Sequence, residues 1–463
     1  MPLALLLISL AGAAALQQEP RAEEVVFATG RGTELRISEL DELLILRHAR
    51  SPRGREILQH LLEGRMVDAI ASERDVTVRE GEIEERVATL EEQVQKSGQA
   101  ESIEEYLKAS GVDPVVFLEY MRLAVLQERL TRLAVGIAEG VNITGEQQRA
   151  WLEEEIAERG VAEEEPPFKK GIVLTCPPVQ IKTHEFLDHL RAQLSEEELK
   201  EACYHLLLAH RIRSQMPDVS PAEIQRAIEA EVTRRREAAE ADPSYAGIPF
   251  ERLLASQGLT PASLVKDPSV SIAALSGLYV DRVYGEDGIR AAYNTEREYF
   301  DGHYGEALGV RALFLRAARF ANEFIPRTFE TAEEEMQQML SVLESEEEFI
   351  AVSEGRSEAQ GELAAGALHW MPKLDRQVRA ELVAEAFDRW GGLTELPKDP
   401  KERLLGPKRS PKGCVLLWLS ARRPAPAWEL MSQQVRQDLR RRFVEDILKP
   451  SDVVLSDASQ TGK

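Results

Sequence analysis

The sequence predicts a mostly α-helical protein: a helical domain that occurs twice, then a small α+β domain and a closing C-terminal helix. Three observations predict this fold class. The stretch HLLEGRMVDAIAS at residues 60–72 returns as HLLLAHRIRSQMP at residues 205–217. Strand-like and helical runs alternate between residues 310 and 420, which is typical of a small α+β domain. Residues 428–449 then carry apolar side chains at helical spacing.

The repeat extends on both sides of these stretches. Upstream, the pattern of Leu35–Leu44 returns at Ile181–Leu190. Downstream, the pattern of Val78–Val87 returns at Val219–Ile228. Between the histidine and the downstream valine, the first copy has 18 residues and the second has 14. The difference is about one helical turn, which a helix absorbs without rotating its apolar face.

A third match predicts the same helix–turn–helix in both copies. YLKASGVDPVVF at 106–117 aligns without a gap to LLASQGLTPASL at 253–264. In each, a glycine follows the first helix, where a left-handed residue ends it. Asp113-Pro114 or Thr260-Pro261 then supplies the N-cap and the first position of the next helix. We therefore expect two copies of one helical domain, at residues 24–165 and 170–305, with Leu62 and Leu207 in equivalent core positions.

The α+β domain is expected at residues 306–424. Val310–Ala317 and Cys414–Ser420 are strand-like, the run near His369 is a third candidate strand, and Arg379–Trp390 has a helical pattern.

The closing helix is expected at residues 425–450, before a flexible tail at 451–463. Its apolar stripe consists of Trp428, Met431, Val435, Leu439, Phe443 and Ile447. Such a stripe is too apolar to stay exposed, so we expect it to pack on one of the helical copies.

The N-terminus resembles an export signal. Leu3–Leu10 is apolar but too short to span a bilayer, and the small residues Ala13-Ala14-Ala15 offer a cleavage site after it. We expect a signal peptide at residues 1–16 and an exported, periplasmic mature chain with no stable membrane insertion. The net charge of −23 argues against a nucleic-acid surface, which requires a basic face.

Metal and cofactor motifs fail on spacing. His184 and His189 are five positions apart, as are His205 and His210. On a helix such side chains lie about 140° apart, so they cannot share a metal ion as residues four positions apart do. The three cysteines are far apart and form no CxxC pair, and no Walker A motif occurs. We expect no metal, no cofactor and no ATP-driven action.

The order of these elements resembles the SurA and PrsA periplasmic foldases. The helical copies resemble the SurA N-terminal domain, and Val310–Ser420 resembles the parvulin (PpiC-type) prolyl isomerase domain. Parvulins carry an active-site histidine in their first strand and another in their last. In this sequence these positions fall on Phe314 and Val415. The parvulin acid falls on Gly355, Glu358 or Ala359, depending on the gap.

The resemblance also implies a binding pocket. The parvulin proline pocket corresponds to Val378, Leu382 and Phe387. Together with Phe314 and Val415, these residues are the expected substrate-binding set. No catalytic residue is expected, because neither side chain at the two histidine positions can form the polar network that the family uses.

Three functions follow as expectations. The first is an ATP-independent periplasmic chaperone that binds unfolded exported polypeptides, among them proline-containing segments or outer-membrane proteins. The second is an active peptidyl-prolyl cis-trans isomerase that uses His303, Glu362 or His369 instead. The third is a non-catalytic envelope scaffold protein that binds a single partner.

Overall fold

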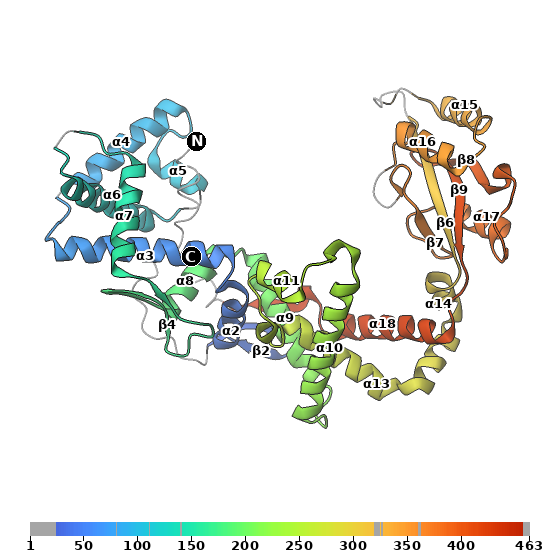
Figure 1. Ribbon diagram of the computed structural model, residues 1–463, viewed down its shortest axis with the longest axis horizontal. Coiled ribbons are helices and arrows are strands. Elements are labelled where there is room, and N and C mark those ends of the chain that lie inside the picture. Colours follow the sequence, from blue (N-terminus) through green and yellow to red (C-terminus); the bar gives the residue numbers. More distant parts are fainter. Residues whose placement is uncertain are drawn as a thin grey trace. The chain divides into compact units, whose positions relative to one another are not determined.

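The computed structural model describes residues 25–79, 81–110, 112–138, 141–318, 325, 327–359 and 363–456. The chain divides into a helical unit (Met1–Leu278 with Phe443–Lys463) and a second unit (Tyr279–Arg442), which Figure 1 colours along the sequence. Helices dominate and the sheets are small, which confirms the predicted fold class. The expected signal peptide lies outside the described residues. No helix among the described residues is long and apolar enough to cross a membrane.

The helical unit contains both copies. Its elements are β1 (Val26–Gly30), β2 (Thr33–Arg36), α2 (Ile37–His48), α3 (Pro52–Glu73), α4 (Glu82–Ser97), α5 (Ile103–Ser110), α6 (Pro114–Val135), α7 (Gly145–Arg159), β3 (Ala162–Glu163), β4 (Ile172–Cys176), β5 (Val179–Lys182), α8 (Thr183–Gln193), α9 (Glu196–Ser214), α10 (Pro221–Ala241), α11 (Phe250–Ser256), α12 (Pro261–Leu264), the start of α13 (Pro268–Thr295) and β10 (Val453–Leu455).

Two β-hairpins with the same register begin the two copies. Val26 pairs with Arg36 in hairpin β1–β2, and Ile172 pairs with Lys182 in hairpin β4–β5. Both differences, 172 − 26 and 182 − 36, are 146, and the same offset relates the other partners. Each hairpin also has a register shift after its first pair. Since a slip of one residue would turn every side chain to the other face, the shared register gives the two hairpins equivalent buried faces.

A third strand extends each hairpin on the same edge. β3 pairs antiparallel with β4, and β10 pairs antiparallel with β1. Residues 453–455 are therefore a strand and not part of the flexible tail expected at 451–463. The ladder hydrogen bonds and the burial of Val453 hold this segment, and Ser456 Oγ donates a hydrogen bond to Val26 O at 2.8 Å. Residues 457–463 lie outside the described residues.

The long helix of each copy packs on the hairpin of the other copy. α3 contacts β5 and α8, whereas α9 contacts β1, β2 and α2. Leu207 of α9 lies against Gly30 of β1, where an added Cβ would be 3.3 Å from a Leu207 methyl carbon. Leu62 of α3 and Leu207 are both buried, with exposed fractions of 6% and 0%. This reciprocal exchange joins the two copies into one compact unit.

Two side-chain contacts repeat the same relationship between the copies. Arg65 of α3 pairs with Glu185 of α8. His210 Nε2 of α9 lies 3.3 Å from Glu39 Oε1 of α2. Glu185 is the counterpart of Glu39 and His210 is the counterpart of Arg65, so the same contact forms twice with a histidine in place of an arginine.

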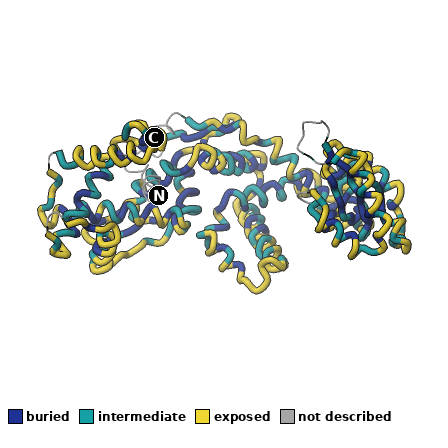
Figure 2. Tube along the Cα trace, turned by 90° about the horizontal axis from the view of Figure 1, so that it is seen from above, coloured by how far each residue is buried: buried dark blue, intermediate teal, exposed yellow. Residues whose placement is uncertain are grey.

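Each copy also has a lobe with its own small core. The first lobe is built by α4, α5 and α6 around Val94, Phe117 and Met121. The second is built by α10 to α13 around Phe250 and Leu254. The exposed outer faces of these helices are yellow in Figure 2, which is the pattern of amphipathic helices around thin cores. In the second lobe Gly258 is left-handed with φ of +74°, as the repeat predicted, whereas Gly111 lies outside the described residues.

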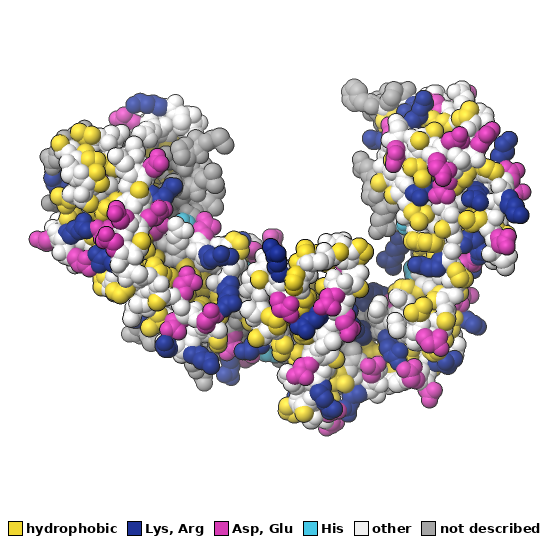
Figure 3. Space-filling view, in the orientation of Figure 1, with side chains coloured by type: hydrophobic (Ala, Val, Ile, Leu, Met, Phe, Trp, Pro, Cys, Tyr) yellow, Lys and Arg dark blue, Asp and Glu magenta, His cyan; other side chains and the backbone are white. Residues whose placement is uncertain are grey.

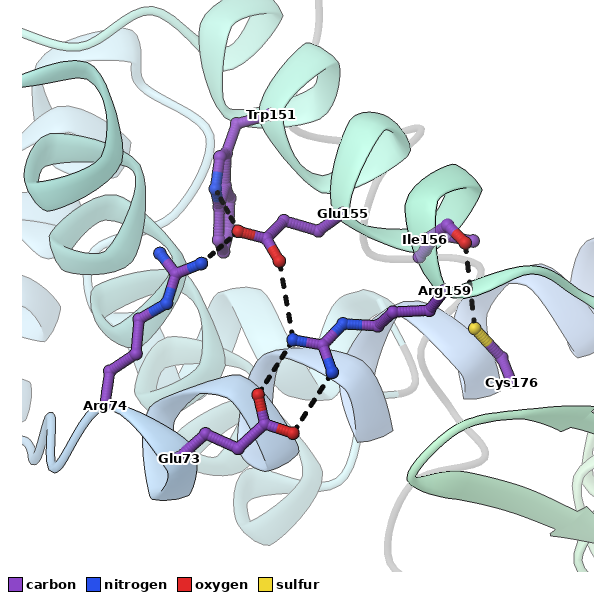
Figure 4. A network of polar contacts seen from close by, with 7 residues as sticks. All are labelled: Glu73, Arg74, Trp151, Glu155, Ile156, Arg159 and Cys176. Atoms are coloured by element: carbon purple, nitrogen blue, oxygen red, sulfur yellow. Dashed lines mark hydrogen bonds and ion pairs between the residues drawn. The ribbon is translucent and has the colours of Figure 1, made fainter.

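A polar network fixes α7 to the C-terminal end of α3 (Figure 4). Arg159 donates hydrogen bonds to both carboxylate oxygens of Glu73, at 3.1 and 2.8 Å. Glu155 accepts from Trp151 Nε1 at 3.3 Å and also pairs with Arg74. The hydrogen bond from Arg159 lowers the pKa of Glu73. Bidentate pairing of this kind sets orientation as well as distance, so α7 is held at a defined angle.

The second unit holds the α+β domain. Its elements are the remainder of α13, α14 (Arg297–Tyr304), β6 (Ala307–Arg316), α15 (Phe329–Leu340), α16 (Glu346–Arg356), β7 (His369–Pro372), α17 (Ala380–Trp390), β8 (Leu404–Ser410), β9 (Gly413–Arg423) and most of α18 (Trp428–Ile447). The sheet is antiparallel with the order β7-β6-β9-β8. β8 was not predicted, because the glycine and proline in LLGPKRS hide a strand pattern.

Three residues of the apolar stripe of α18 are buried within the second unit, whereas Trp428, Phe443 and Ile447 are only partly buried. Met431, Val435 and Leu439 pack against Val280, Ile289 and Phe300. These partners lie in α13 and α14, inside the range expected for copy 2, and not in the sheet. These partners of α18 nevertheless belong to the same compact unit as the α+β domain, because the second unit begins at Tyr279.

The side chains of β6 and β9 point alternately to the two faces of the sheet, and both faces are apolar. Leu313, Leu315, Leu416 and Trp418 face a core that α15 and α16 close. Leu308, Val310, Ala312, Leu417 and Leu419 face a second core, which α17 closes with Leu382, Val383, Ala386 and Trp390. Successive residues of a strand point to opposite faces, so Phe314 and Val415 belong to the α17 side.

Candidate functional site

Phe314 and Val415 are direct partners across β6 and β9. Each side chain is half-buried, in contrast to the fully buried Leu313 and Leu416 beside them. The pair lies near the end of the strands, where Val415 packs against the edge of the α17 core. The two positions at which the resemblance places histidines are therefore adjacent and partly open.

The pair borders a hollow of about 820 Å³. Its apolar lining is formed by Ala312, Phe314, Ala359, Leu363, Val378, Leu382, Pro411, Val415 and Leu417. Its polar and charged lining is formed by Gln377, Arg379, Glu381, Glu385, Lys408, Arg409, Ser410 and Lys412. A volume of this size and a largely apolar surface are typical of ligand sites.

The wall beside α17 is held by a buried polar pair. His369 Nε2 lies 2.7 Å from Asp375 Oδ2, and both side chains are almost fully buried. Asp375 Oδ1 accepts hydrogen bonds from the backbone N–H groups of Gln377 and Val378, each at 2.7 Å. Burial disfavours the Asp375 carboxylate, but the hydrogen bonds from His369, Val378 and Gln377 outweigh it and lower its pKa. The pair thus fixes the turn that presents Val378 to the hollow.

The opposite wall is a segment that runs along the free edge of β6. Phe314 N donates to Ser357 Oγ at 3.0 Å, and Glu358 N donates to Phe314 O at 2.8 Å. The Glu358 carboxylate accepts hydrogen bonds from Arg316 N at 2.8 Å and from Arg327 Nη1 at 2.6 Å. It is therefore engaged outside the hollow. Of the three candidates for the acid position, Ala359 alone lines the hollow and Gly355 lies within α16.

The hollow contains four of the five expected binding residues. Phe314, Val378, Leu382 and Val415 line it, but Phe387 does not. Phe387 lines a separate hollow with Lys373 and Glu306. It follows Leu382 by five positions on α17, which turns it by about 140° to another face of the helix.

The histidines expected for an active isomerase do not line the hollow. His369 is engaged with Asp375, as described above. His303 lies in α14, with its ring 4.5 Å from that of Tyr299, and burial followed by the charge of Arg376 lowers its pKa. Glu362 lies outside the described residues. Among the described residues no cluster of metal-ligating side chains occurs.

Sequence reasoning missed the charged rim of the hollow. Arg379, Glu381, Glu385, Lys408, Arg409 and Lys412 line it from α17 and the β8–β9 hairpin. The cluster of basic residues at 408–412 was a visible signal, but without β8 nothing in the sequence placed it beside Phe314.

Comparison with known proteins gives structural neighbours only. No family model and no curated protein matches the chain. Among solved structures, peptidylprolyl isomerase PrsA from Bacillus anthracis is 13% identical over 53% of this chain and 93% of its own, with a TM-score of 0.25. PrsA from Bacillus cereus is 16% identical over 63% and 88%, with a TM-score of 0.23. Foldase protein PrsA from Streptococcus pneumoniae is 12% identical over 60% and 90%, with a TM-score of 0.27.

The hollow combines an apolar floor with a charged rim. Its floor, formed by Phe314, Val415 and Leu417, offers apolar surface and no side-chain hydrogen-bond donor. Ser410 Oγ donates to Gly413 O at 3.0 Å, so this hydroxyl is already used. Such a site can bury an apolar side chain of a ligand, whose polar backbone would remain near the charged rim.

Proposed function

We propose that this chain is an exported, ATP-independent chaperone that binds unfolded polypeptides, and that its α+β domain holds extended apolar or proline-containing segments without isomerising them. The observation that carries the proposal is the Phe314–Val415 pair on the floor of the hollow. An accessible apolar floor recognises side chains that folded proteins bury, and unfolded chains are the proteins that expose them.

The proposed lack of catalysis rests on the same pair. Rotation about an X-Pro bond has a barrier of roughly 20 kcal/mol. A catalyst must stabilise the twisted amide more than either planar isomer. Phenylalanine and valine side chains contact all three forms through dispersion alone, so they bind without favouring the twisted one.

The hollow also fits weak and reversible binding. It is small, and most of its rim is exposed. Affinity from such a small contact is partly cancelled by the entropy lost on association. A chaperone that has no ATP motif needs this reversibility, because nothing else releases its client.

Peptide binding tests the site. A fluorescent peptide with a central Leu-Pro pair should bind the full chain, and Phe314→Ala should weaken it by about 1–2 kcal/mol, roughly five- to thirtyfold in Kd. Phe387→Ala is the matched control, because Phe387 is also half-buried in the same domain but lies outside the hollow. Equal effects of the two variants would show that the hollow is not the binding site.

Client binding tests the wider function. An unfolded outer-membrane protein diluted from urea should aggregate less when the chain is present at equimolar or higher ratio. No suppression at any ratio would reject the chaperone. A pull-down that yields one stoichiometric partner, together with no binding of generic unfolded chains, would instead support a scaffold.

A further inference from the structure

The charges around the hollow are mostly paired. Glu381 pairs with Arg379 at 2.9 Å, and Glu385 pairs with Lys408 at 2.8 Å. Arg409 pairs with Glu333 at 2.8 Å and with Glu330 at 3.1 Å, both of which belong to α15. Each carboxylate that lines the hollow is therefore already neutralised by a cation.

Lys412 is the exception. Its ammonium group has no carboxylate within ion-pair distance among the described residues, although the side chain is exposed and lines the hollow. The described part of the rim thus retains one unpaired positive charge and no unpaired negative charge. A ligand that offers one carboxylate beside its apolar side chain would complete the pairing.

The position of Lys412 is fixed by its backbone. Pro411 and Lys412 form the two-residue turn between β8 and β9, and Ser410 and Gly413 pair on either side of it. Lys412 O accepts a hydrogen bond from Ala317 N at 3.0 Å, which ties the turn to the end of β6. Gly413 packs so closely on β6 that a Cβ would lie 2.0 Å from Leu315 O. The lysine therefore projects from a rigid turn next to Phe314 and Val415.

We propose that the hollow selects segments in which an acidic residue lies next to the apolar residue, and that Lys412 is the residue that determines this preference. The inference rests on the proposed peptide-binding function and adds a substrate class to it. It also runs against the charge of the whole chain, which is −23 and repels acidic ligands at long range. At physiological salt that repulsion decays over about 8 Å, so the local cation decides the preference once the segment is in the hollow.

Three host peptides test the proposal. They share the central Leu-Pro pair and carry Asp, Asn or Lys directly before the leucine. Their Kd values are measured by fluorescence anisotropy with the full chain at low salt and at 1 M salt. An exposed ion pair contributes little, so we expect the Asp peptide to bind about two- to fivefold tighter than the Asn peptide and the Lys peptide to bind weakest. At 1 M salt the difference should largely disappear.

Variants assign the effect to one residue. Lys412→Gln should abolish the preference for Asp over Asn, and Lys412→Glu should reverse the order of the Asp and Lys peptides. Lys401→Glu is the matched control, since Lys401 is exposed in the same domain and does not line the hollow. Circular dichroism and thermal melting confirm that each variant is folded, and Lys412→Gln keeps the test valid if the charge reversal disturbs the turn.

The outcomes of these experiments distinguish the charge preference and the role of Lys412 from the proposed binding function. Equal binding of the three peptides to the wild type would overturn the charge preference and leave the proposed binding function standing. A preference that survives in both Lys412 variants would overturn the role of Lys412. If none of the peptides binds, the proposed binding function fails, and this inference fails with it.

Discussion

Phe314 lies directly opposite Val415 across β6 and β9, and both side chains face the hollow that Val378 and Leu382 close. The two positions at which parvulin-like sequences carry histidines thus form one apolar surface. Neither side chain donates a hydrogen bond, and Ala359 is the candidate acid residue that lines the hollow.

Prolyl isomerisation by the wild-type chain should be near the uncatalysed rate. A protease-free assay on a proline peptide measures it. The double variant Phe314→His with Val415→His should gain at most a partial activity, because none of the three candidates for the acid position brings a carboxylate into the hollow. Wild-type turnover like that of an ordinary parvulin, abolished by changing His303 or His369, would contradict this prediction.

Leu62→Ala and Leu207→Ala should each lower the free energy of unfolding by about 2–5 kcal/mol, the cost of a cavity at a buried leucine. Both residues are buried where one copy packs on the hairpin of the other. Urea unfolding measures the change. Leu118→Ala is the control, because Leu118 is 47% exposed and should cost under about 0.5 kcal/mol. A change this small at Leu62 would mean that the repeat has been misinterpreted.

The repeat could be predicted because both copies keep their apolar spacing and turn residues. The offset of 146 between the two hairpins follows from the match of Leu35 to Ile181. The exchange of α3 and α9 could not be predicted, because the apolar face of Leu62 would fit either hairpin equally well. A sequence records that a face must be buried and does not record its partner.

The residues of the hollow also divide into those that the sequence could predict and those that it could not. Four of the residues that the parvulin resemblance brings together, Phe314, Val378, Leu382 and Val415, line one hollow, whereas Phe387 lines another. Phe387 follows Leu382 by five positions on α17, and a helix turns residues at that spacing to different faces. β10 was missed because Val453–Leu455 is too short to give a strand pattern and pairs with β1 from the other end of the chain.

Stability should fall as the pH falls below about 6.5, the pKa of histidine in an unfolded chain. Burial, together with nearby arginine charges, lowers the pKa of His48 and His205, and burial lowers that of His189. The unfolded chain therefore takes up these protons first, and stability is lost progressively from 6.5 down to the lowered pKa values.

Urea unfolding at pH 7.5, 6.5 and 5.5 measures this loss of stability. The variant His205→Gln should make the free energy of unfolding depend less steeply on pH. His205 Nδ1 is buried and has no hydrogen-bond partner within the described structure, so protonation there has no compensating contact. Stability that increases as the pH falls from 7.5 to 5.5 would show that the histidines gain acidic partners on folding.

Deleting residues 449–463 should destabilise the helical unit, whereas deleting 457–463 should not. The longer deletion removes β10, and with it the ladder on β1 and the buried side chain of Val453. Net loss of a few hydrogen bonds and of one buried valine costs roughly 2–4 kcal/mol. The edge of β1 would also become open to pairing with other chains, so the longer deletion should aggregate more readily. Urea unfolding and light scattering on the two deletions measure both effects. Equal stability of the two would mean that residues 453–455 behave as the flexible tail that the sequence first suggested.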